Sequence, residues 1–484
     1  MLEEPLVFAR SNPGAVACRL PQCDVPESPV DSLIPPEQQR QSRLALPELY
    51  EWDVVRHYTR LSHQSYGVDV GIYPLGSCTM KYNPRINEDM ARLPGLAEIH
   101  PAQPAQQLQG ALRLMLELER ALCAIGGMDA VTLQPPAGAQ GEFTALACFR
   151  AFHRDRGQTQ RTRIIVPDSS HGTNPASAAR CGFTITQIAS TAEGRTDLDA
   201  LDRALGDDVA GFMLTNPNTL GLFESGVARI CEMVHTAGGL VYCDGANMNA
   251  LLGVARPGDM GFDAMHFNLH KTFSTPHGGG GPGAGPIGVK RHLEPYLPVP
   301  RIVEKPDGTL GLDEDRPKSI GRVHSFFGNF GVLVRGYAYI LSHGPEGLAE
   351  VTRRAVLNAN YMRHRLEGAY EIPHPGPCMH EFVLSADRQK AQGCKALDIA
   401  KRLIDLGLHP PSVYFPLIVS EAMMIEPTET ETKRALDHLI EAFLQVAREC
   451  EDTPDVVLHA PTQAIRSRLD EVRAAREMVL REEL

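Results

Sequence analysis

The sequence predicts an α/β fold with three parts: a large domain built on a mostly parallel sheet, a smaller C-terminal α+β domain, and an N-terminal arm. Short apolar, β-rich segments alternate with helix-compatible stretches between residues 163 and 269. Strands separated by crossover helices form parallel sheets covered by helices on both faces. The chain has 484 residues, which is more than one hydrophobic core holds, so we expect two or three domains.

Four segments are expected along the chain. Residues 1–104 form a proline-rich arm and a loop-rich segment, 105–335 the large domain, 336–460 the small domain, and 461–484 a charged helical tail. Apolar side chains at helical spacing predict a helix over 104–125, which ends at Gly126 and Gly127.

The β-rich segments predict strands at 163–167, 183–188, 209–214, 239–243 and 264–269, with helices over 197–205 and 225–237 between them. The C-terminal third predicts helices over 345–368 and 395–406 and strands at 380–384 and 421–425. Thr428 and Glu431 are expected to form a capping box before a last helix that ends near Cys450.

Composition excludes several classes of protein. Lys and Arg number 47 and Asp and Glu 59, a formal charge of −12, which argues against nucleic-acid or anionic-membrane partners because both require concentrated positive charge. The 11 cysteines include no CxxC pair, so no metal site or disulfide framework is expected. No signal-like or membrane-spanning apolar run occurs, and we expect a cytoplasmic protein.

Polar residues follow each predicted strand, where parallel sheets bind their ligands. Asp244 ends one strand segment, and Lys271 follows the next. A lysine amine can hold an aldehyde cofactor as a Schiff base, and an aspartate can pair with a pyridinium nitrogen. The pair therefore predicts pyridoxal 5'-phosphate. Ala246, just after Asp244, and Asn268, near the end of the next predicted strand, are expected to contact it.

The remaining parts of such a site can also be assigned. Gly138, Ala139 and Gln140 precede a helix-compatible run and predict a phosphate site at a helix N-terminus. His171 could stack on the cofactor ring, and His270 could hydrogen-bond the phosphate. Each of these residues alone is more often a turn former or a solvated strand end; their order along a parallel sheet favours the cofactor.

Two further features bear on this interpretation. Lys81, in the segment SCTMKYNP, is the competing lysine, but it precedes the strand–helix alternation and has no acidic strand-end partner. Seven of the thirteen residues from 276 to 288 are glycine. This run directly follows Lys271, and we expect the loop 278–285 to be mobile so that a substrate arm can enter.

Long motifs carry a resemblance to a known family: DVGIYPLGSCTMKYNP at 69–84, QPPAGAQGE at 134–142, DSSHGTNPASA at 168–178, DGANMNA at 244–250 and HFNLHKTFSTPHGGGGPG at 266–283. Over nearly its whole length the chain resembles glycine dehydrogenase (decarboxylating), the pyridoxal-phosphate P-protein of the glycine cleavage system. It is similar to the lysine-bearing half, which in the split form is a separate second subunit.

The resemblance implies a fold-type-I pyridoxal-phosphate enzyme with a seven-stranded type of sheet. It implies Lys271 as the Schiff-base lysine, with His171 as the other catalytic residue. It also implies decarboxylation of glycine and transfer of the aminomethyl group to the lipoyl arm of the H-protein. Expected partners are glycine dehydrogenase subunit 1 in an α2β2 assembly and, functionally, the aminomethyltransferase and dihydrolipoyl dehydrogenase.

Alternatives stay open at this point. Another fold-type-I reaction on a small amino acid, such as transamination or a lyase reaction, would use the same cofactor. A non-catalytic scaffold subunit is a further alternative, against which an intact Lys271 argues. A P-loop or Rossmann nucleotide binder is disfavoured, because neither glycine-rich fingerprint occurs in the required context.

Overall fold

The computed structural model describes residues 3–42, 44–277 and 283–480. The chain forms two compact units: residues 68–459, and residues 1–67 together with 460–484. The domain limits expected from the sequence, at 104, 335 and 460, stay a prediction. The expected mobility of the loop 278–285 falls largely on residues 278–282, which lie outside the described residues.

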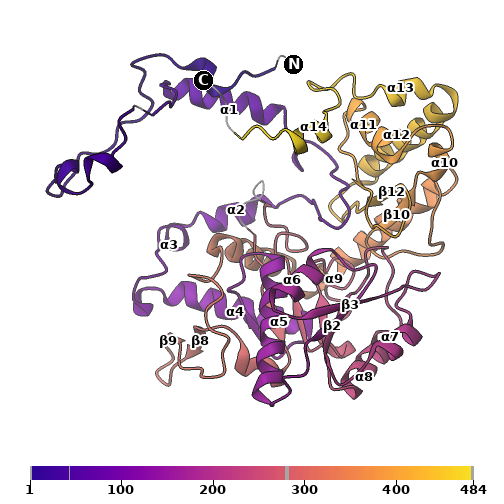
Figure 1. Cartoon of the computed structure of the whole chain (residues 1–484), viewed down its shortest axis with the longest axis horizontal. Helices are drawn as coiled ribbons and strands as arrows, with labels where there is room; N and C mark the ends of the chain where they lie inside the picture. The colour runs from indigo at the N-terminus through magenta and orange to yellow at the C-terminus, as the bar shows by residue number, and fades with distance from the viewer. Residues whose placement is uncertain (1–2, 43, 278–282, 481–484) are drawn as a thin grey trace. The chain divides into compact units, whose positions relative to one another are not determined.

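A seven-stranded mixed sheet forms the centre of the larger unit (Figure 1), in the order β1-β7-β6-β5-β4-β2-β3. The strands are β1 (Ala130–Thr132), β2 (Arg163–Pro167), β3 (Thr184–Ile188), β4 (Val209–Thr215), β5 (Leu240–Asp244), β6 (Ala264–His266) and β7 (Ile287–Val289). Neighbouring strands from β3 to β6 pair in parallel, whereas β7 runs antiparallel to both β6 and β1. This confirms the mostly parallel sheet and the α/β class.

Two short strands of the sheet and one strand end differ from the sequence expectation. The strands β1 and β7 have three residues each, too few to show a periodicity in sequence. The strand expected over 264–269 ends at His266, because the chain then turns: the Lys271 N–H donates to the Asn268 carbonyl at 3.0 Å. That turn sets the lysine at the strand end.

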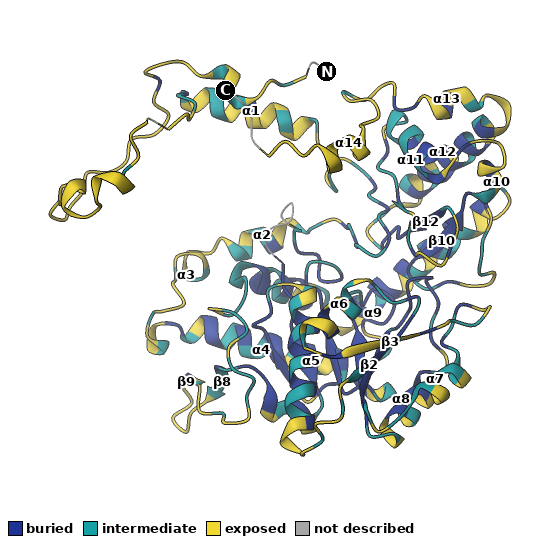
Figure 2. Ribbon diagram, viewed as in Figure 1, coloured by how far each residue is buried: buried dark blue, intermediate teal, exposed yellow. Residues whose placement is uncertain are grey.

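Helices cover both faces of this sheet, and their inner sides are buried (Figure 2). They include α4 (Gln109–Gly126), α5 (Gly138–Asp155), α6 (Thr173–Arg180), α7 (Leu198–Ala204) and α8 (Val227–Thr236). Successive residues along the strands belong alternately to two separate apolar cores. Phe212 and Val241 belong to one, and Met213 and Tyr242 to the other. The sheet is therefore buried on both sides, as parallel sheets are.

The C-terminal part of the larger unit holds a three-stranded antiparallel sheet, ordered β10-β12-β11. Its strands are β10 (Phe382–Ser385), β12 (Ala422–Ile425) and β11 (Ser412–Val413). Its main helices are α11 (Ala396–Asp405) and α12 (Lys433–Asp452), with the shorter α10 (Asp387–Lys390) and α13 (Pro454–Leu458). These elements confirm the α+β character expected there. A separate hairpin pairs β8 (Arg301–Glu304) with β9 (Leu310–Asp313).

One expectation for the C-terminal helices is confirmed and one was wrong. The helix expected over 345–368 is the second part of α9 (Phe330–Leu366), which a non-helical Gly344 (φ 61°, ψ 179°), just before Pro345, separates from the first part. The capping box of Thr428 and Glu431 does not form. Instead Thr432 caps α12 by accepting from the Ala435 N–H at 3.2 Å. Thr428, at a positive φ of 62°, lies in the preceding turn.

The expected proline-rich arm is more structured than its composition indicates. Within the smaller unit, α1 (Glu51–His63) contacts the 3₁₀ turn Val7–Arg10. The Glu4 carboxylate accepts from His57 at 2.9 Å and pairs with Arg10 at 2.7 Å and Arg60 at 2.9 Å. In the charged tail, the one helix within the described residues 461–480 is the short α14 (Glu471–Arg476). Two short helices, α2 (Arg85–Ala91) and α3 (Pro94–Ala97), follow the arm in the larger unit.

In the described part of the chain, no helix is both long enough and apolar enough to span a bilayer.

Candidate active site

A cavity of about 180 Å³ opens at the carboxyl ends of the parallel strands. Parallel sheets hold their ligands at this edge. The residues that line the cavity come from the strand ends, the first turn of α5, the segment 71–84 and the start of β10. They are Ser77, Gly138, Ala139, Glu142, His171, Thr173, Thr215, Pro217, Thr219, Asp244, Ala246, Asn247, His266, Asn268, Lys271, His380 and Glu381.

Asp244 is a buried carboxylate at the end of β5. It accepts hydrogen bonds from the Asn174 side chain and from the Ala246 N–H, each at 3.1 Å. Burial alone would raise the pKa of this carboxyl, but nearby His266 and Lys271, together with the two hydrogen bonds, hold it below its usual value. An ionised carboxylate at this depth suits a cationic partner, such as a protonated pyridine nitrogen.

Lys271 reaches the same cavity from the turn after β6. Its ammonium donates to the Ser77 carbonyl at 2.7 Å, so a single weak acceptor orients it. Among the described residues, no carboxylate forms a hydrogen bond with the Lys271 side chain, and Asp244 acts on it only through space. The amine is therefore held in place but is not locked into a salt bridge.

The first turn of α5 supplies an anion cradle. Gly138 and Ala139 line the cavity, and the first backbone N–H groups of a helix have no partner within the helix. The surroundings require bare backbone: a Cβ on Gly285 would lie 2.1 Å from the Ala137 carbonyl, and one on Gly138 would lie 2.6 Å from the Asn268 side-chain oxygen. The glycines thus let two chain segments meet beside the cradle.

A short hydrogen-bond chain joins Glu142 to His171. The Thr173 hydroxyl oxygen lies 2.7 Å from a Glu142 oxygen and 2.8 Å from Nδ1 of His171. The second Glu142 oxygen accepts from Ser177 at 2.8 Å. Burial, and then the charge of Asp244, raise the pKa of Glu142 to about 7. Burial also lowers the pKa of His171. A proton on Glu142 satisfies the whole chain and leaves a neutral imidazole in the cavity.

The residues present fit pyridoxal phosphate. Four polar side-chain atoms of the cavity lining are buried and lack a hydrogen-bond partner among the described residues: the Thr215 hydroxyl, the Asn268 side-chain oxygen and both ring nitrogens of His380. Buried polar atoms are rarely left unpaired, so these atoms are suited to hydrogen bonds with a polar ligand. A lysine amine, an ionised aspartate, a flat imidazole and a helix N-terminus match the four chemical parts of this cofactor.

The structure brings seven of the nine residues expected from the sequence to one cavity: Lys271, Asp244, Ala246, His171, Gly138, Ala139 and Asn268. The other two do not line it. The Gln140 side chain donates to the Val323 carbonyl at 3.1 Å, although its backbone N–H belongs to the first turn of α5. His270 accepts from the Ala284 N–H at 3.3 Å, and burial lowers its pKa to about 3. Their contact with the phosphate stays a prediction.

The competing lysine lies elsewhere. Lys81 is buried, pairs with Glu429 at 2.6 Å and donates to the Tyr339 hydroxyl at 3.2 Å. Despite burial, which lowers it, Glu429 and then Tyr339 raise the pKa of Lys81 above its usual value. An amine held as a paired cation is a poor nucleophile, so Lys81 ties the segment 71–84 to its neighbours.

Sequence reasoning missed several residues of the cavity. Thr215 follows a predicted strand, and Glu142 and Ser77 stand in the quoted motifs, so a signal existed for these three. Asn174, in the motif DSSHGTNPASA, does not line the cavity but donates to Asp244. His380 and Glu381 had none, because they reach the cavity from β10, more than a hundred positions beyond Lys271. Only the fold brings them there.

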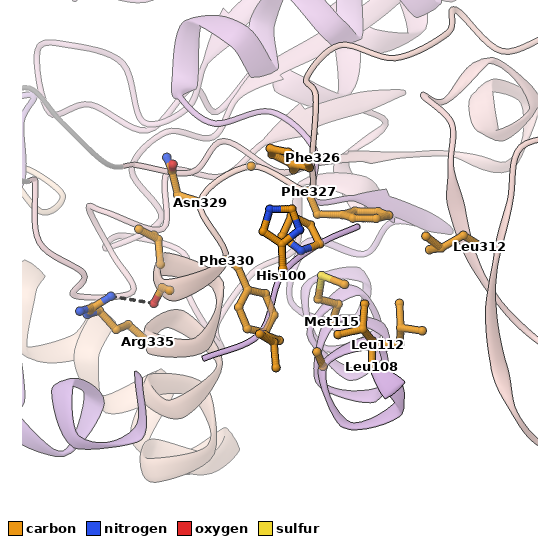
Figure 3. A pocket seen from close by; sticks show the side chains of 16 residues that line it. His100, Leu108, Leu112, Met115, Leu312, Phe326, Phe327, Asn329, Phe330 and Arg335 are labelled. Atoms are coloured by element: carbon orange, nitrogen blue, oxygen red, sulfur yellow. Dashed lines mark hydrogen bonds between the residues drawn. The ribbon is translucent and has the colours of Figure 1, made fainter. Parts of the chain in front are cut away.

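A second cavity, of about 510 Å³, lies away from this chemistry (Figure 3). Leu108, Leu112, Met115 and Phe330 are among the apolar side chains around it. Its one arginine, Arg335, is engaged in two hydrogen bonds to Glu88, at 2.8 and 2.9 Å. Among the described residues that line this cavity there is no lysine, cysteine, serine, aspartate or glutamate, so it is not the candidate reaction site.

The fold and the site define a fold-type-I pyridoxal-phosphate enzyme. A solved structure described as glycine decarboxylase (P-protein) of the glycine cleavage system in inhibitor-bound form matches with a TM-score of 0.72 and 22% identity, over 86% of this chain and 94% of that one. A Lactobacillus brevis glutamate decarboxylase matches with a TM-score of 0.65 and 13% identity, over 86% and 96%. These likenesses show the fold.

Sequence comparison is more specific. Residues 351–467 match the family model "Glycine dehydrogenase, C-terminal domain", and residues 144–281 match "Aminotransferase class-V". Probable glycine dehydrogenase (decarboxylating) subunit 2 of Caldanaerobacter subterraneus is 56% identical, over 99% of each chain. The protein of that name in Halalkalibacterium halodurans is 58% identical, over 99% of this chain and 98% of its own. The chain belongs to the glycine dehydrogenase (decarboxylating) subunit 2 family.

Gly285→Ala tests the cradle. The added methyl group would meet the Ala137 backbone and displace the first turn of α5, so we expect cofactor affinity to fall by about tenfold or more. Titration of the visible absorption band with pyridoxal phosphate measures it. Gly110→Ala is the matched control, because a Cβ there meets nothing within 4 Å. Equal cofactor affinity in the two variants would contradict the cradle.

Glu142→Gln tests the neutral carboxyl in the protein without cofactor. The folded-state pKa of about 7 lies above the ordinary 4.5, so the stability that its proton contributes is complete below pH 4.5 and is lost as the pH rises through 7. A glutamine is neutral throughout. We expect the variant to gain stability relative to wild type by on the order of 2 kcal/mol between pH 5 and pH 8, measured by chemical denaturation. A difference that does not change with pH would contradict a neutral Glu142.

Proposed function

We propose that this chain is the lysine-bearing subunit of an enzyme that decarboxylates glycine with pyridoxal 5'-phosphate. One observation carries the proposal: Asp244 and Lys271 meet in a single cavity beside the N-terminus of α5. The relatives that share more than half of this sequence are called glycine dehydrogenase (decarboxylating). A lysine and an aspartate in one cavity are the side chains that pyridoxal-phosphate chemistry uses.

When bound, pyridoxal phosphate supplies an aldehyde that captures amines and a protonated ring that accepts the electron pair of a broken bond at the α-carbon. Lys271 is the residue to hold the aldehyde and, once released as an amine, to move protons near it. Asp244 would keep the proton on the ring nitrogen. His171 would contact the ring, and the first turn of α5 would bind the phosphate.

The net reaction balances only with an acceptor. The C–C bond of glycine breaks and CO2 leaves, while the remaining aminomethyl group forms a C–S bond to one sulfur of a lipoyl disulfide. The other sulfur becomes a thiol, so the disulfide is reduced. We propose the lipoylated H-protein as the carrier, with the aminomethyltransferase and the dihydrolipoyl dehydrogenase acting on it afterwards.

The relatives' designation as a second subunit supports a partner, glycine dehydrogenase subunit 1, and we propose an α2β2 heterotetramer that completes the site. We also propose a cytoplasmic location. All eleven cysteines lie in the described residues and are free thiols, which suits a reducing compartment.

Lys271→Ala tests the function. With the partner subunit and lipoylated carrier present, we expect release of CO2 from carboxyl-labelled glycine to fall by about a thousandfold or more, with loss of the visible cofactor band. Lys318→Ala, at an exposed lysine that pairs with Asp155, should leave both unchanged. Carrier-independent products from glycine, such as glyoxylate, would instead favour a transaminase.

A further inference from the structure

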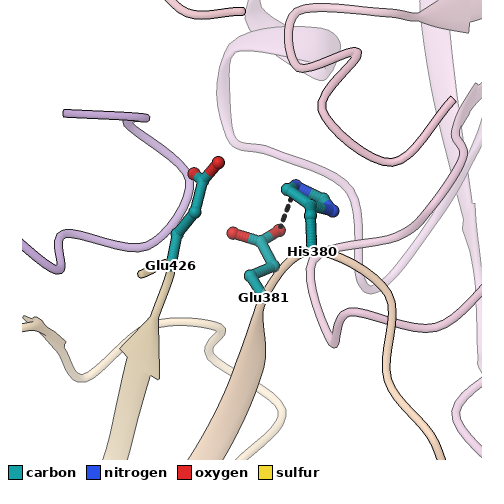
Figure 4. A group of neighbouring side chains, drawn as sticks. All are labelled: His380, Glu381 and Glu426. Carbon is teal, nitrogen blue, oxygen red and sulfur yellow. Dashed lines mark ion pairs between the residues drawn. The ribbon is translucent and has the colours of Figure 1, made fainter. Parts of the chain in front are cut away.

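Three buried side chains outside the assigned cofactor contacts form a cluster at the small-domain side of the cavity (Figure 4). His380 and Glu381 precede β10, and Glu426 follows β12. The antiparallel pairing of Phe382 with Ile425 sets them side by side. One ligand atom from each lies within 4.8 Å of the others, and the residues are 2%, 4% and 0% exposed, respectively.

Glu426 is the member of the cluster with the fuller set of hydrogen-bond donors. Its carboxylate accepts hydrogen bonds from the Thr79 hydroxyl, at 2.8 and 2.9 Å. It also accepts from the Asn247 side chain, at 2.9 and 3.0 Å, and from the Asn249 side chain, at 2.8 Å. Neutral donors surround both oxygens, and a buried carboxylate with several such donors stays charged.

Glu381 is the neutral member. Two buried carboxyl groups this close cannot both ionise, and Glu381 has the weaker set of donors, with one hydrogen bond from the Ser77 N–H at 3.0 Å. Burial, and then repulsion from Glu426, raise the pKa of Glu381 well above its usual value, although Lys271 opposes this. Its proton is available to a ligand in the cavity.

His380 adds a second unused donor. Neither of its ring nitrogens has a hydrogen-bond partner among the described residues, and burial lowers the pKa of this imidazole. Its Nε2 lies 3.6 Å from Oε1 of Glu381, too far for a good hydrogen bond. Both side chains line the cavity together with Lys271. The unpaired imidazole of His380 and the protonated carboxyl of Glu381 can therefore both donate hydrogen bonds to an acceptor group of a ligand.

We propose that Glu381 and His380 form a pair of neutral donors that binds the carboxylate of the substrate, with Glu426 as the positioning residue that keeps the proton on Glu381. The proposal rests on the proposed function. Among the described residues that line the cavity there is no arginine, so neutral donors would have to bind a substrate carboxylate, and His380 has both ring nitrogens without a partner. Neutral donors also suit the reaction. The substrate carboxylate loses its charge as CO2 leaves, and a strong cationic clamp would stabilise the ground state more than the transition state.

The test is equilibrium binding of glycine and of methylamine, which has the amine but no carboxylate, to the cofactor-loaded assembly at pH 8. The visible cofactor band reports both. In Glu426→Gln the repulsion on Glu381 disappears, and Glu381 ionises and repels the ligand carboxylate. We expect glycine affinity to fall by about tenfold or more and methylamine affinity to change less than about twofold.

Further variants make the result specific. Glu381→Gln keeps a neutral N–H donor, so glycine affinity should stay within about threefold of wild type. The double variant Glu381→Gln/Glu426→Gln should regain the affinity of Glu381→Gln, because no group is left to ionise. Glu431→Gln, at a half-buried carboxyl outside the cavity lining, is the matched control and should bind both ligands as wild type does.

Several outcomes would overturn the proposal. Equal loss of glycine and methylamine affinity in Glu426→Gln would make the cluster purely structural, and so would a double variant that is no better than Glu426→Gln. A stoichiometric divalent metal ion in the dialysed holoenzyme, absent from Glu426→Gln, would make the cluster a metal site. A wild-type assembly that binds methylamine but not glycine would reject the proposed function itself, whereas normal glycine binding without discrimination among variants rejects only the carboxylate site.

Discussion

The site depends on one constraint: Asp244 must remain ionised although it is buried at the end of β5. An isolated carboxylate in this position would take up a proton. Two hydrogen bonds, from Asn174 and the Ala246 N–H, and the nearby charge of Lys271 prevent that. These residues follow β2, β5 and β6, whose carboxyl ends lie at one edge only in the folded sheet, so the charge state of Asp244 is a property of the fold.

The surroundings of each acidic side chain in the cavity determine its protonation state. Asp244 keeps its charge because donors face it, whereas Glu142 and Glu381 each lie near another carboxylate and hold a proton. The result is one negative group for the cofactor ring and two neutral acids on other sides of the cavity. Titratable groups whose pKa values are driven apart within one cleft are typical of acid–base chemistry. Ser77 joins two of these regions, since its carbonyl accepts from Lys271 and its N–H donates to Glu381.

Much of this arrangement could be predicted from the sequence. Lys271, Asp244 and His171 follow strands whose apolar runs are long enough to recognise, and the carboxyl ends of parallel strands converge. The short strands β1 and β7 were missed because three residues carry no period. The capping residue of α12 was misassigned because three threonines, Thr428, Thr430 and Thr432, precede it. His380, Glu381 and Glu426 could not be assigned, because their meeting depends on the register of β10 and β12.

The central claim is that Lys271 holds the cofactor. Borohydride reduction of the cofactor-loaded chain converts the lysine–cofactor bond into a stable secondary amine, and peptide mass spectrometry then locates the label. We expect a pyridoxyl group on Lys271 in near-stoichiometric yield. We expect none on Lys81, whose side chain pairs with Glu429 and donates to Tyr339. A label on Lys81, or no stable label at Lys271, would contradict it.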